Sequence, residues 1–343
     1  MGMTMGMRWL AGQLASNSRN SLSANTWKQY ERAWLKFVAF CAQHEMDPHR
    51  CNSAFVSLYF TQLNNEGEQR AVGHQLIDQA SAAISASYRI AGLASPCDGP
   101  LCTVAHEAAR CTLITQKRPR AEVAFEDLQQ LLNHHLPPNG PEPTLEVRML
   151  VTGVLLCYTG LLRFDDLSRV LVHEDLLRIY PGEHLELFLW KSKTDQCAEG
   201  AWVTIGATEG PHCVVGLVEK LLARGAYDRS PPPGRDGGPL IRAVVTDAGG
   251  EQRLEHRSTQ LPEITPALQY KVVLKRVNEL FGEAGVTKKI GMHAFRVAGA
   301  TEAVNAGTDR VMVQKLGRWA TAETFEKVYV KDTVPKRDHR AYN

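Results

Sequence analysis

The sequence predicts a predominantly helical α+β fold in two domains, the first all-helical and the second a mixture of helices and strands. The chain has 343 residues, which is longer than a single hydrophobic core usually grows. Apolar residues recur at helical spacing along most of it, whereas residues 183–205 alternate as strands do. A charged, proline-bearing stretch at residues 117–122 separates the two kinds of pattern. We therefore expect an N-terminal extension over residues 1–20, a helical domain over 21–117 and a mixed domain over 118–343.

The helical domain opens with the segment SANTWKQYERAWLKFVAFCAQH. Its apolar positions fall on one helical face: Trp27, Tyr30, Trp34, Phe37, Val38 and Cys41. Ser23, Asn25 or Thr26 can cap the start, because their side-chain oxygens accept from free backbone N–H groups. Similar patterns predict three more helices, over residues 51–67, 74–95 and 100–114.

The mixed domain begins with helical patterns over residues 125–135 and 145–167. The segments EHLELFLWKSKTD and GAWVTI then alternate around a polar turn, which predicts a β-hairpin. A helix follows over residues 212–225, and a second hairpin is possible before Leu261.

A final group of helices begins after this region. Thr265 as N-cap and Pro266 at the first helical position predict a helix over residues 264–285. The segment MHAFRVAGAT has the pattern of another helix.

Net positive charge is concentrated at the C-terminal end of the chain. The formal net charge is +2, but the residues from Thr287 onward carry eleven Lys/Arg against six Asp/Glu, or +5, and the remainder carries −3. This distribution fits either a solvated basic face or a surface for a polyanion. The sequence has no apolar run of about 18 residues and no secretory signal pattern, so we expect an intracellular protein without a membrane segment.

The eight cysteines are scattered without a CxxC pair, which favours reduced thiols. Cys97, Cys102, His106 and Cys111 lie close together in sequence and could in principle bind zinc. Their spacing does not match a standard zinc motif, and Cys102 and His106 also fit an ordinary helix face. We expect no metal and no cofactor.

Three short motifs carry residue types that suit phosphate chemistry. His293 and Arg296 are three residues apart, so a helix would place an imidazole and a guanidinium on one face. In TGLLRFDDL, Arg163 and Asp166 have the same spacing, although a surface ion pair explains that pattern as well. In KSKTDQ, Lys191 and Lys193 lie at the tip of the hairpin and could reach into a groove or stay solvated.

The segment LGRWATAETFEKVYV, residues 316–330, joins a Gly-Arg-Trp turn to a helix-like run that ends near Tyr329. A buried aromatic side chain is the common reason for such a tyrosine. A nucleophile is the alternative.

Taken in order, Arg163, a hairpin lysine, His293-x-x-Arg296, Gly317-Arg318-Trp319 and Tyr329 form a series that resembles the tyrosine recombinase (phage integrase) family. The resemblance covers nearly the whole chain, since residues 20–115 are similar to the family's helical core-binding (SAM-like) domain. The segments HAFRVAGAT and LGRW are most similar to recombinases of eukaryotic tyrosine-recombinase mobile elements.

The resemblance implies a role for each matched residue. Tyr329 would be the nucleophile, Arg163 and Arg296 the phosphate clamp, and His293 a phosphate contact and proton-transfer partner. Lys193 matches the family's hairpin lysine better than Lys191 does. Trp319 takes the position of the family's His or Trp, and Asp166 that of its acidic residue.

The function implied is metal-independent, site-specific DNA recombination or integration through a covalent 3′-phosphotyrosyl intermediate. Double-stranded DNA would be the partner, with dimers and a tetramer forming on it, in the nucleus of a eukaryote or otherwise in the cytoplasm or nucleoid. One alternative is a decayed or domesticated recombinase that only binds DNA. Another is an enzyme that relaxes DNA as a monomer, in the manner of a type IB topoisomerase.

The interval from Trp319 to Tyr329 is one residue longer than in the family. An extra residue turns a regular helix by about 100°, so we expect either a changed helix phase at Tyr329 or a bulge before it. Tyr342 is a second candidate nucleophile that lies beyond the motif.

Overall fold

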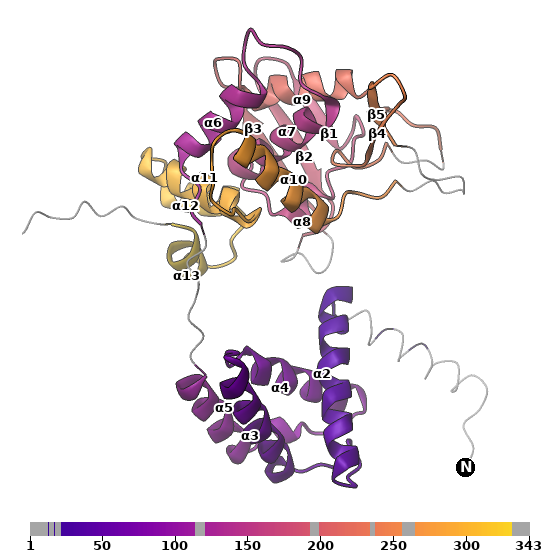
Figure 1. Cartoon of the computed structure of the whole chain (residues 1–343), viewed down its shortest axis with the longest axis vertical. Helices are drawn as coiled ribbons and strands as arrows, with labels where there is room; N and C mark the ends of the chain where they lie inside the picture. Colours follow the sequence, from indigo (N-terminus) through magenta and orange to yellow (C-terminus); the bar gives the residue numbers. More distant parts are fainter. Residues whose placement is uncertain are drawn as a thin grey trace, which may run out of the picture. The chain divides into compact units, whose positions relative to one another are not determined.

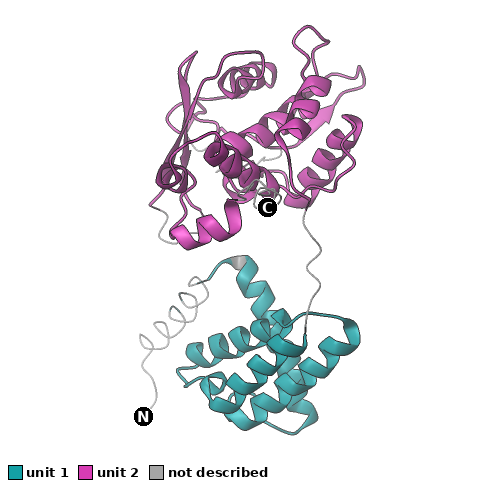
Figure 2. Cartoon of the chain, turned by 90° about the vertical axis from the view of Figure 1, so that its left-hand side faces the viewer, with its two compact units in different colours: residues 1–118 teal, residues 119–343 magenta. Residues whose placement is uncertain are grey.

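The structure is a computed structural model that describes residues 22–113, 121–192, 199–233, 237–255 and 265–330, with the isolated residues 13 and 17. The chain divides into two compact units, residues 1–118 and 119–343 (Figure 2). In the parts described, no helix is long and apolar enough to cross a membrane.

The first unit is all-helical (Figure 1). Its helices are α2 (Ala24–Gln43), α3 (Ser53–Arg70), α4 (Gln75–Ile90) and α5 (Pro100–Thr112), with a short 3₁₀ turn at Pro96–Asp98. Helix α2 packs on α4, and α3 packs on α5. Ser23 caps α2 by accepting a hydrogen bond from the backbone N–H of Thr26 at 3.2 Å. The four helices expected from the apolar spacing are thus confirmed.

Aromatic rings fill the core of the first unit. Phe37 and Phe40 both pack against Tyr59, with ring centroids 5.2 and 4.9 Å apart. The hydroxyl of Tyr88 accepts from the backbone N–H of Cys51 at 3.0 Å and donates to its carbonyl at 3.2 Å. Burial raises the pKa of Tyr88 to about 12, so its hydroxyl stays neutral and satisfied.

The second unit combines helices with a small three-stranded sheet (Figure 1). Its first part contains α6 (Phe125–His135), α7 (Leu145–Thr159), α8 (Phe164–Leu167), β1 (Leu177–Tyr180), β2 (His184–Leu189), β3 (Ala201–Gly206) and α9 (Val214–Arg224). Its second part contains β4 (Val244–Thr246), β5 (Gln252–Leu254), α10 (Tyr270–Glu283), α11 (His293–Asn305), α12 (Arg310–Leu316), α13 (Ala322–Thr324) and a π-helical turn (Phe325–Tyr329).

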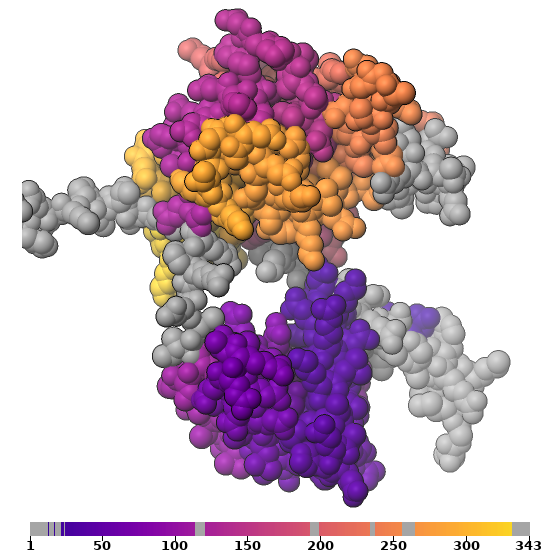
Figure 3. Space-filling model, viewed as in Figure 1, coloured from indigo at the N-terminus to yellow at the C-terminus, as the bar shows by residue number. Residues whose placement is uncertain are grey.

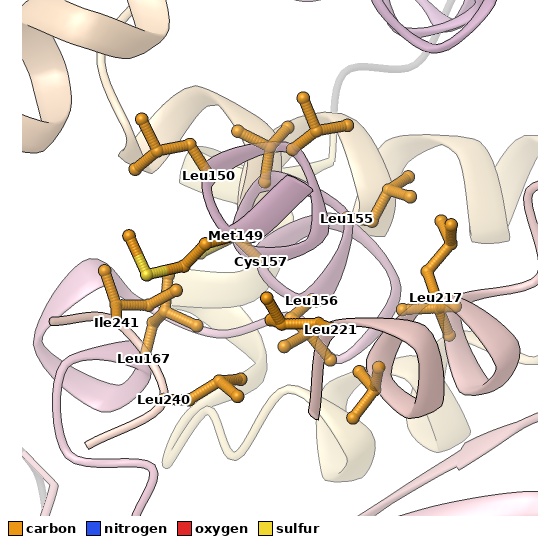
Figure 4. Close-up of a cluster of buried hydrophobic side chains, with 14 of the residues drawn as sticks. Met149, Leu150, Leu155, Leu156, Cys157, Leu167, Leu217, Leu221, Leu240 and Ile241 are labelled. Atoms are coloured by element: carbon orange, nitrogen blue, oxygen red, sulfur yellow. The ribbon is translucent and has the colours of Figure 1, made fainter. Parts of the chain in front are cut away.

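Helix α7 is the centre of this unit. Its side chains are apolar nearly all round, which is the pattern of a helix buried on every side. It packs against α6, α9 and α11. Figure 4 shows Leu156 of α7 next to Leu221 of α9, and Ile241 next to Leu167; all four belong to one buried cluster.

Helices α7 and α11 approach each other closely at Gly299. A Cβ atom built at this position would lie 2.0 Å from the carbonyl oxygen of Tyr158, nearer than real Cβ atoms approach. The glycine therefore lets the backbone of α11 lie directly against α7.

Strands β1, β2 and β3 form an antiparallel sheet in that order. Leu185 and Leu187 of β2 pair with Ile205 and Val203 of β3, and all four side chains are buried. The β2–β3 hairpin expected from the sequence is confirmed, as is the second hairpin, β4–β5. Strand β1 was not expected, although a Pro-Gly turn with Gly182 at φ 76° joins it to β2.

The expected start of helix α10 is wrong. The helix begins at Tyr270 after Gln269, not at Thr265 and Pro266. Ala267 forms an antiparallel bridge with Arg242, and the N–H of Leu268 donates to the carbonyl of Ile241 at 3.0 Å. Because these bonds hold the backbone extended, the helix starts only after them. On the face shown in Figure 3, the orange surface of α10 lies between the β4–β5 hairpin and the yellow helices.

Candidate active site

A separate hydrophobic cluster gathers around the C-terminal end of the described chain. Its buried members are Leu161, Ala300, Val313, Trp319, Phe325, Tyr329 and Val330. They come from the loop after α7, from α11 and α12, and from the last helical turns. This cluster holds the Tyr329 side chain, which is 6% exposed, against the first turns of α11.

The helix before Tyr329 contains a bulge. Residues Phe325–Tyr329 form a π-helical turn, closed by a hydrogen bond from the N–H of Val330 to the carbonyl of Phe325 at 3.2 Å. A π turn accommodates one extra residue in a helix. Of the two outcomes expected from the long Trp319–Tyr329 interval, the structure has the bulge.

Tyr329 lies among the residues of the HxxR motif and the Gly-Arg-Trp turn. Its ring centroid is 5.2 Å from that of His293 and 4.6 Å from that of Trp319. The guanidinium carbon of Arg296 is 5.4 Å from the same ring. The hydroxyl of Thr301 donates to the backbone carbonyl of Tyr329 at 3.0 Å, which fixes this turn on α11.

Arg296 is fully buried in the middle of this group. Its Nη1 donates to the carbonyl of Leu161, and its Nη2 donates to the carbonyl of Gly317. Its guanidinium carbon also lies 4.3 Å from the centre of the Trp319 ring, a cation–π contact. Arg296 thus ties together three segments that are far apart in sequence.

Asp166 and Arg163 lie at the start of the short helix α8. The Oδ2 atom of Asp166 accepts from the backbone N–H of Arg163 at 3.0 Å, and it lies 3.9 Å from Nη1 of the same arginine. The Asp166 side chain is completely buried and that of Arg163 is 16% exposed, so this is not the surface ion pair that the sequence left open.

The turn after α12 aims the Trp319 side chain inward. A Cβ atom at Gly317 would lie 1.7 Å from the Trp319 ring, so only glycine leaves room for the indole there. The backbone N–H of Trp319 donates to the backbone carbonyl of Gln314 at 3.2 Å. The side-chain amide of Gln314 donates in turn to the backbone carbonyl of Trp319 at 3.1 Å.

Several buried donors at this site lack a hydrogen-bond acceptor among the described residues. Among the described residues, those without a hydrogen bond include Nη1 of Arg163, Nε of Arg296, Nε of Arg318 and Nε1 of Trp319. Buried polar groups normally find partners, and an exception calls for a ligand or a special role. N–H groups that lack an acceptor suit an anion.

The electrostatics favour the same kind of ligand. Burial, followed by the charges of Arg163 and Arg318, lowers the pKa of Arg296 to about 9. Burial also lowers the pKa of Arg318, although Asp166 opposes this change. A bound anion would counter both effects by stabilising the charged guanidinium groups.

The structure thus brings six of the expected site residues together: Arg163, Asp166, His293, Arg296, Trp319 and Tyr329. Lys193 and Tyr342 lie outside the described residues, and Lys191 is exposed next to that gap. The sequence reasoning assigned no role to Arg318 or Leu161, which also belong to the site. Arg318 lies within the quoted Gly-Arg-Trp turn, but its burial has no sequence signal.

The residues considered for zinc make other contacts in the structure. The thiol of Cys102 donates to the carbonyls of Ser53 and Pro96, whereas Nδ1 of His106 lies 3.3 Å from Asp78. Cys111 is exposed. Within the described residues, no group of three or more His, Cys, Asp or Glu side chains could hold a metal ion.

Solved structures of DNA recombinases share this architecture. The XerH site-specific recombinase bound to palindromic difH substrate, a post-cleavage complex, matches 92% of this chain and 80% of its own, with a TM-score of 0.52 and 13% identity. The Tn1549 transposon integrase in complex with circular intermediate DNA matches 94% and 96%, with a TM-score of 0.50 and 15% identity. A lambda integrase dimer bound to a COC′ core site matches 98% and 79%, with a TM-score of 0.50 and 13% identity.

No protein-family model matches the chain, and no curated protein matches its sequence. The likeness to the solved structures extends over both units at low sequence identity. The chain therefore has the α+β fold of the tyrosine recombinases.

Proposed function

We propose that the chain is a site-specific DNA strand-exchange enzyme that works through a covalent 3′-phosphotyrosyl intermediate. The observation that carries the proposal is the position of Tyr329 beside His293, Arg296 and Trp319. The buried N–H donors of this site lack acceptors among the residues that the structure describes. A scissile phosphate would supply the missing acceptors, and the tyrosine would supply the nucleophile.

The reaction balances without a further reactant. The Tyr329 oxygen attacks phosphorus while the bond from phosphorus to the 5′-oxygen breaks, and a 5′-hydroxyl from a partner strand later reverses the step. His293 would assist the proton transfer from Tyr329, and Lys193 would protonate the leaving 5′-oxygen. The guanidinium groups of Arg163 and Arg296 and the imidazole of His293 would neutralise charge on the phosphorane, with each preorganised donor contributing roughly 3 kcal/mol.

We propose that both units bind duplex DNA. The helical unit would be the core-binding domain, and the second unit would be the catalytic domain. DNA is bound in the XerH and Tn1549 integrase structures, and the lambda integrase structure contains a dimer on its site. We propose that this chain likewise assembles into dimers and a tetramer on DNA, and that its affinity falls steeply with salt. The HAFRVAGAT and LGRW segments support a mobile element as its source.

A suicide-substrate assay tests the proposal. Purified protein is mixed with nicked duplexes from the flanks of the element. The nick makes the fragment that carries the new 5′-hydroxyl short, so it leaves after cleavage and the covalent intermediate is trapped. We expect a denaturation-resistant protein–DNA adduct with the unaltered chain and none with Tyr329→Phe. If neither protein forms an adduct on a duplex that both bind, the strand-exchange proposal fails.

One observation favours a second candidate, a decayed recombinase that binds DNA without cutting it. The Tyr329 side chain is almost entirely buried, as a packing tyrosine would be. Equal binding of the same duplexes by the unaltered chain and Tyr329→Phe, without an adduct from either, is the result expected for this candidate.

A further inference from the structure

We propose that Arg318 is a third phosphate-binding arginine of this site, in addition to Arg163 and Arg296. The inference rests on the proposed function, because the phosphate in question is the scissile one. It assigns a role to a residue that lies beside Trp319 and that the series of matched positions leaves unassigned.

The backbone at Arg318 has a conformation that usually selects glycine. The N–H of Arg318 donates to the carbonyl of Lys315 at 2.9 Å, and the N–H of Trp319 donates to that of Gln314 at 3.2 Å. These two bonds form a Schellman motif at the end of α12, in which Arg318 takes the left-handed position with φ 57°. Glycine adopts this conformation without strain, whereas an arginine here has a conformational cost.

The Arg318 side chain is directed into the site rather than into solvent. It is 16% exposed, and its Nη2 lies 3.7 Å from Oδ2 of Asp166. Nη1 donates to the carbonyl of Leu316 at 3.1 Å, and Nη2 donates to that of Leu161 at 3.4 Å. Arg296 donates to the same Leu161 carbonyl, so one backbone oxygen holds both guanidinium groups.

These contacts leave the Nε–H group of Arg318 buried and without an acceptor among the described residues. The Nε–H of Arg296 and the indole N–H of Trp319 are also buried without an acceptor among the described residues. The non-bridging oxygens of a phosphate can accept from several such donors at once. The structure therefore offers Arg318 as a donor of the same kind as Arg296.

The charge count supports a dianionic ligand. Nη1 of Arg163 and Nη2 of Arg318 lie 3.9 and 3.7 Å from Oδ2 of Asp166, and the same carboxylate interacts electrostatically with Arg296. These three arginines and Asp166 together carry a net charge of +2. A phosphodiester has one negative charge, whereas the pentavalent phosphorane formed by attack on it has two. Three arginines thus match the phosphorane better than the substrate, which is the requirement for faster reaction.

A purely structural role is the competing explanation, since Arg318 also contacts Asp166 and Leu161. A neutral phosphate analogue distinguishes the two roles. A methylphosphonate at the scissile position removes the charge that an arginine would neutralise, so a phosphate-binding arginine becomes dispensable on it. An arginine that only supports the fold stays equally necessary on both substrates.

The experiment measures adduct formation by the unaltered chain, Arg318→Gln and Arg178→Gln on phosphodiester and methylphosphonate suicide duplexes. Arg178 is the matched control, because it stacks at 4.4 Å on another indole, that of Trp202, on the sheet. We expect Arg318→Gln to lose about 100-fold on the phosphodiester and less than about threefold on the methylphosphonate. Arg178→Gln should match the unaltered chain on both. Equal losses on the two substrates, or no loss on the phosphodiester, would overturn the proposal while leaving the Tyr329 chemistry intact.

A binding measurement keeps the inference testable if no adduct forms at all. Sodium tungstate supplies a tetrahedral dianion, and the N–H signals of the Trp319 indole and the Arg318 guanidinium report its position in heteronuclear NMR spectra. We expect both signals to shift on titration and the Trp319 shift to require at least tenfold more tungstate in Arg318→Gln. If the Arg318 signal does not move while the Trp319 signal does, Arg318 is not a ligand; if neither moves, the inference also falls.

Discussion

Aromatic rings form the core of the first unit and also lie against Arg296 in the second. The two clusters differ in whether their buried polar groups form hydrogen bonds. In the first unit, Tyr88 exchanges two hydrogen bonds with the backbone of Cys51. In the second, the rings of Trp319 and Tyr329 lie near the buried guanidinium of Arg296, whose Nε has no acceptor in the part of the chain that the structure describes. Similar ring packing therefore accompanies a polar group with satisfied hydrogen bonds in the first unit and a buried donor without an acceptor at the described site of the second.

The difference shows what turns a hydrophobic cluster into a candidate active site. Burial of neutral groups that satisfy one another stabilises a fold. Burial of charges in excess of their partners costs free energy, which an anionic ligand can offset. Stability and ligand binding should consequently respond to different substitutions in the two clusters.

The largest effect is expected from changes in length at the π turn. Deleting Val328, which is exposed, should convert the π turn to a regular helix and keep Tyr329 near its place, with adduct formation within about tenfold of the unaltered chain. Inserting an alanine after Val328 should turn Tyr329 by about 100° and reduce the adduct to background. The suicide-substrate assay measures both variants. Loss of activity on deletion would mean that the π geometry itself is required.

A smaller effect separates the two buried tyrosines. Tyr88→Phe leaves the backbone N–H and carbonyl of Cys51 without their buried partner, so the free energy of unfolding should fall by about 1–3 kcal/mol. Tyr88→Phe should still form the protein–DNA adduct under conditions in which the variant is folded. Tyr329→Phe should give the reverse pattern, with stability nearly unchanged and no adduct. Urea titrations followed by circular dichroism supply the stabilities, and similar losses in the two variants would contradict the comparison.

The smallest effect comes from an exception in the first unit. Nε2 of His106 is buried without a hydrogen bond in the described structure, and its ring packs edge-on against Phe60. Burial lowers the pKa of His106 below 6.5; Asp78 opposes the shift, whereas Arg110 and His74 reinforce it. The unfolded chain therefore binds the proton more readily, and the stabilisation is complete above pH 6.5 and is lost as the pH falls.

The free energy of unfolding should accordingly decrease between pH 6.5 and 5.5, by at most about 1.4 kcal/mol per pH unit from this one residue. His106→Gln is the control that removes the titration. Urea titrations of both proteins across this range provide the test. A slope that is unchanged in His106→Gln would assign the pH dependence to other groups.

Periodicity and spacing were sufficient to predict most helices and the β2–β3 hairpin, because the side chains that define them face a core. They left the β4–β5 hairpin only as a possibility, since most of its side chains are not buried. They failed at Thr265, where backbone pairing with the segment around Arg242 overrides a good capping sequence. They also missed the break after α7, where Leu161 takes a left-handed conformation at φ 49°. Long-range pairing and local strain leave little trace in a short window of sequence.

The candidate site was predictable for a different reason. The helical spacing of His293 and Arg296 indicated that they share one face of a helix, and the sequence Gly-Arg-Trp indicated a turn. The burial of Arg318 and the donors without acceptors depend on where three distant segments meet, so the order of residues does not specify them. The extra residue before Tyr329 was visible in the sequence, but its accommodation by a π turn required the structure.

The contact at Gly299 has a consequence for how freely this chain can vary. Alanine suits a helix better than glycine at most positions. At position 299 it would force α11 away from α7, and with it the His293 and Arg296 side chains. In a library of random substitutions selected for recombination, position 299 should therefore accept glycine alone, whereas the solvent-exposed positions of the same helix should accept many residues.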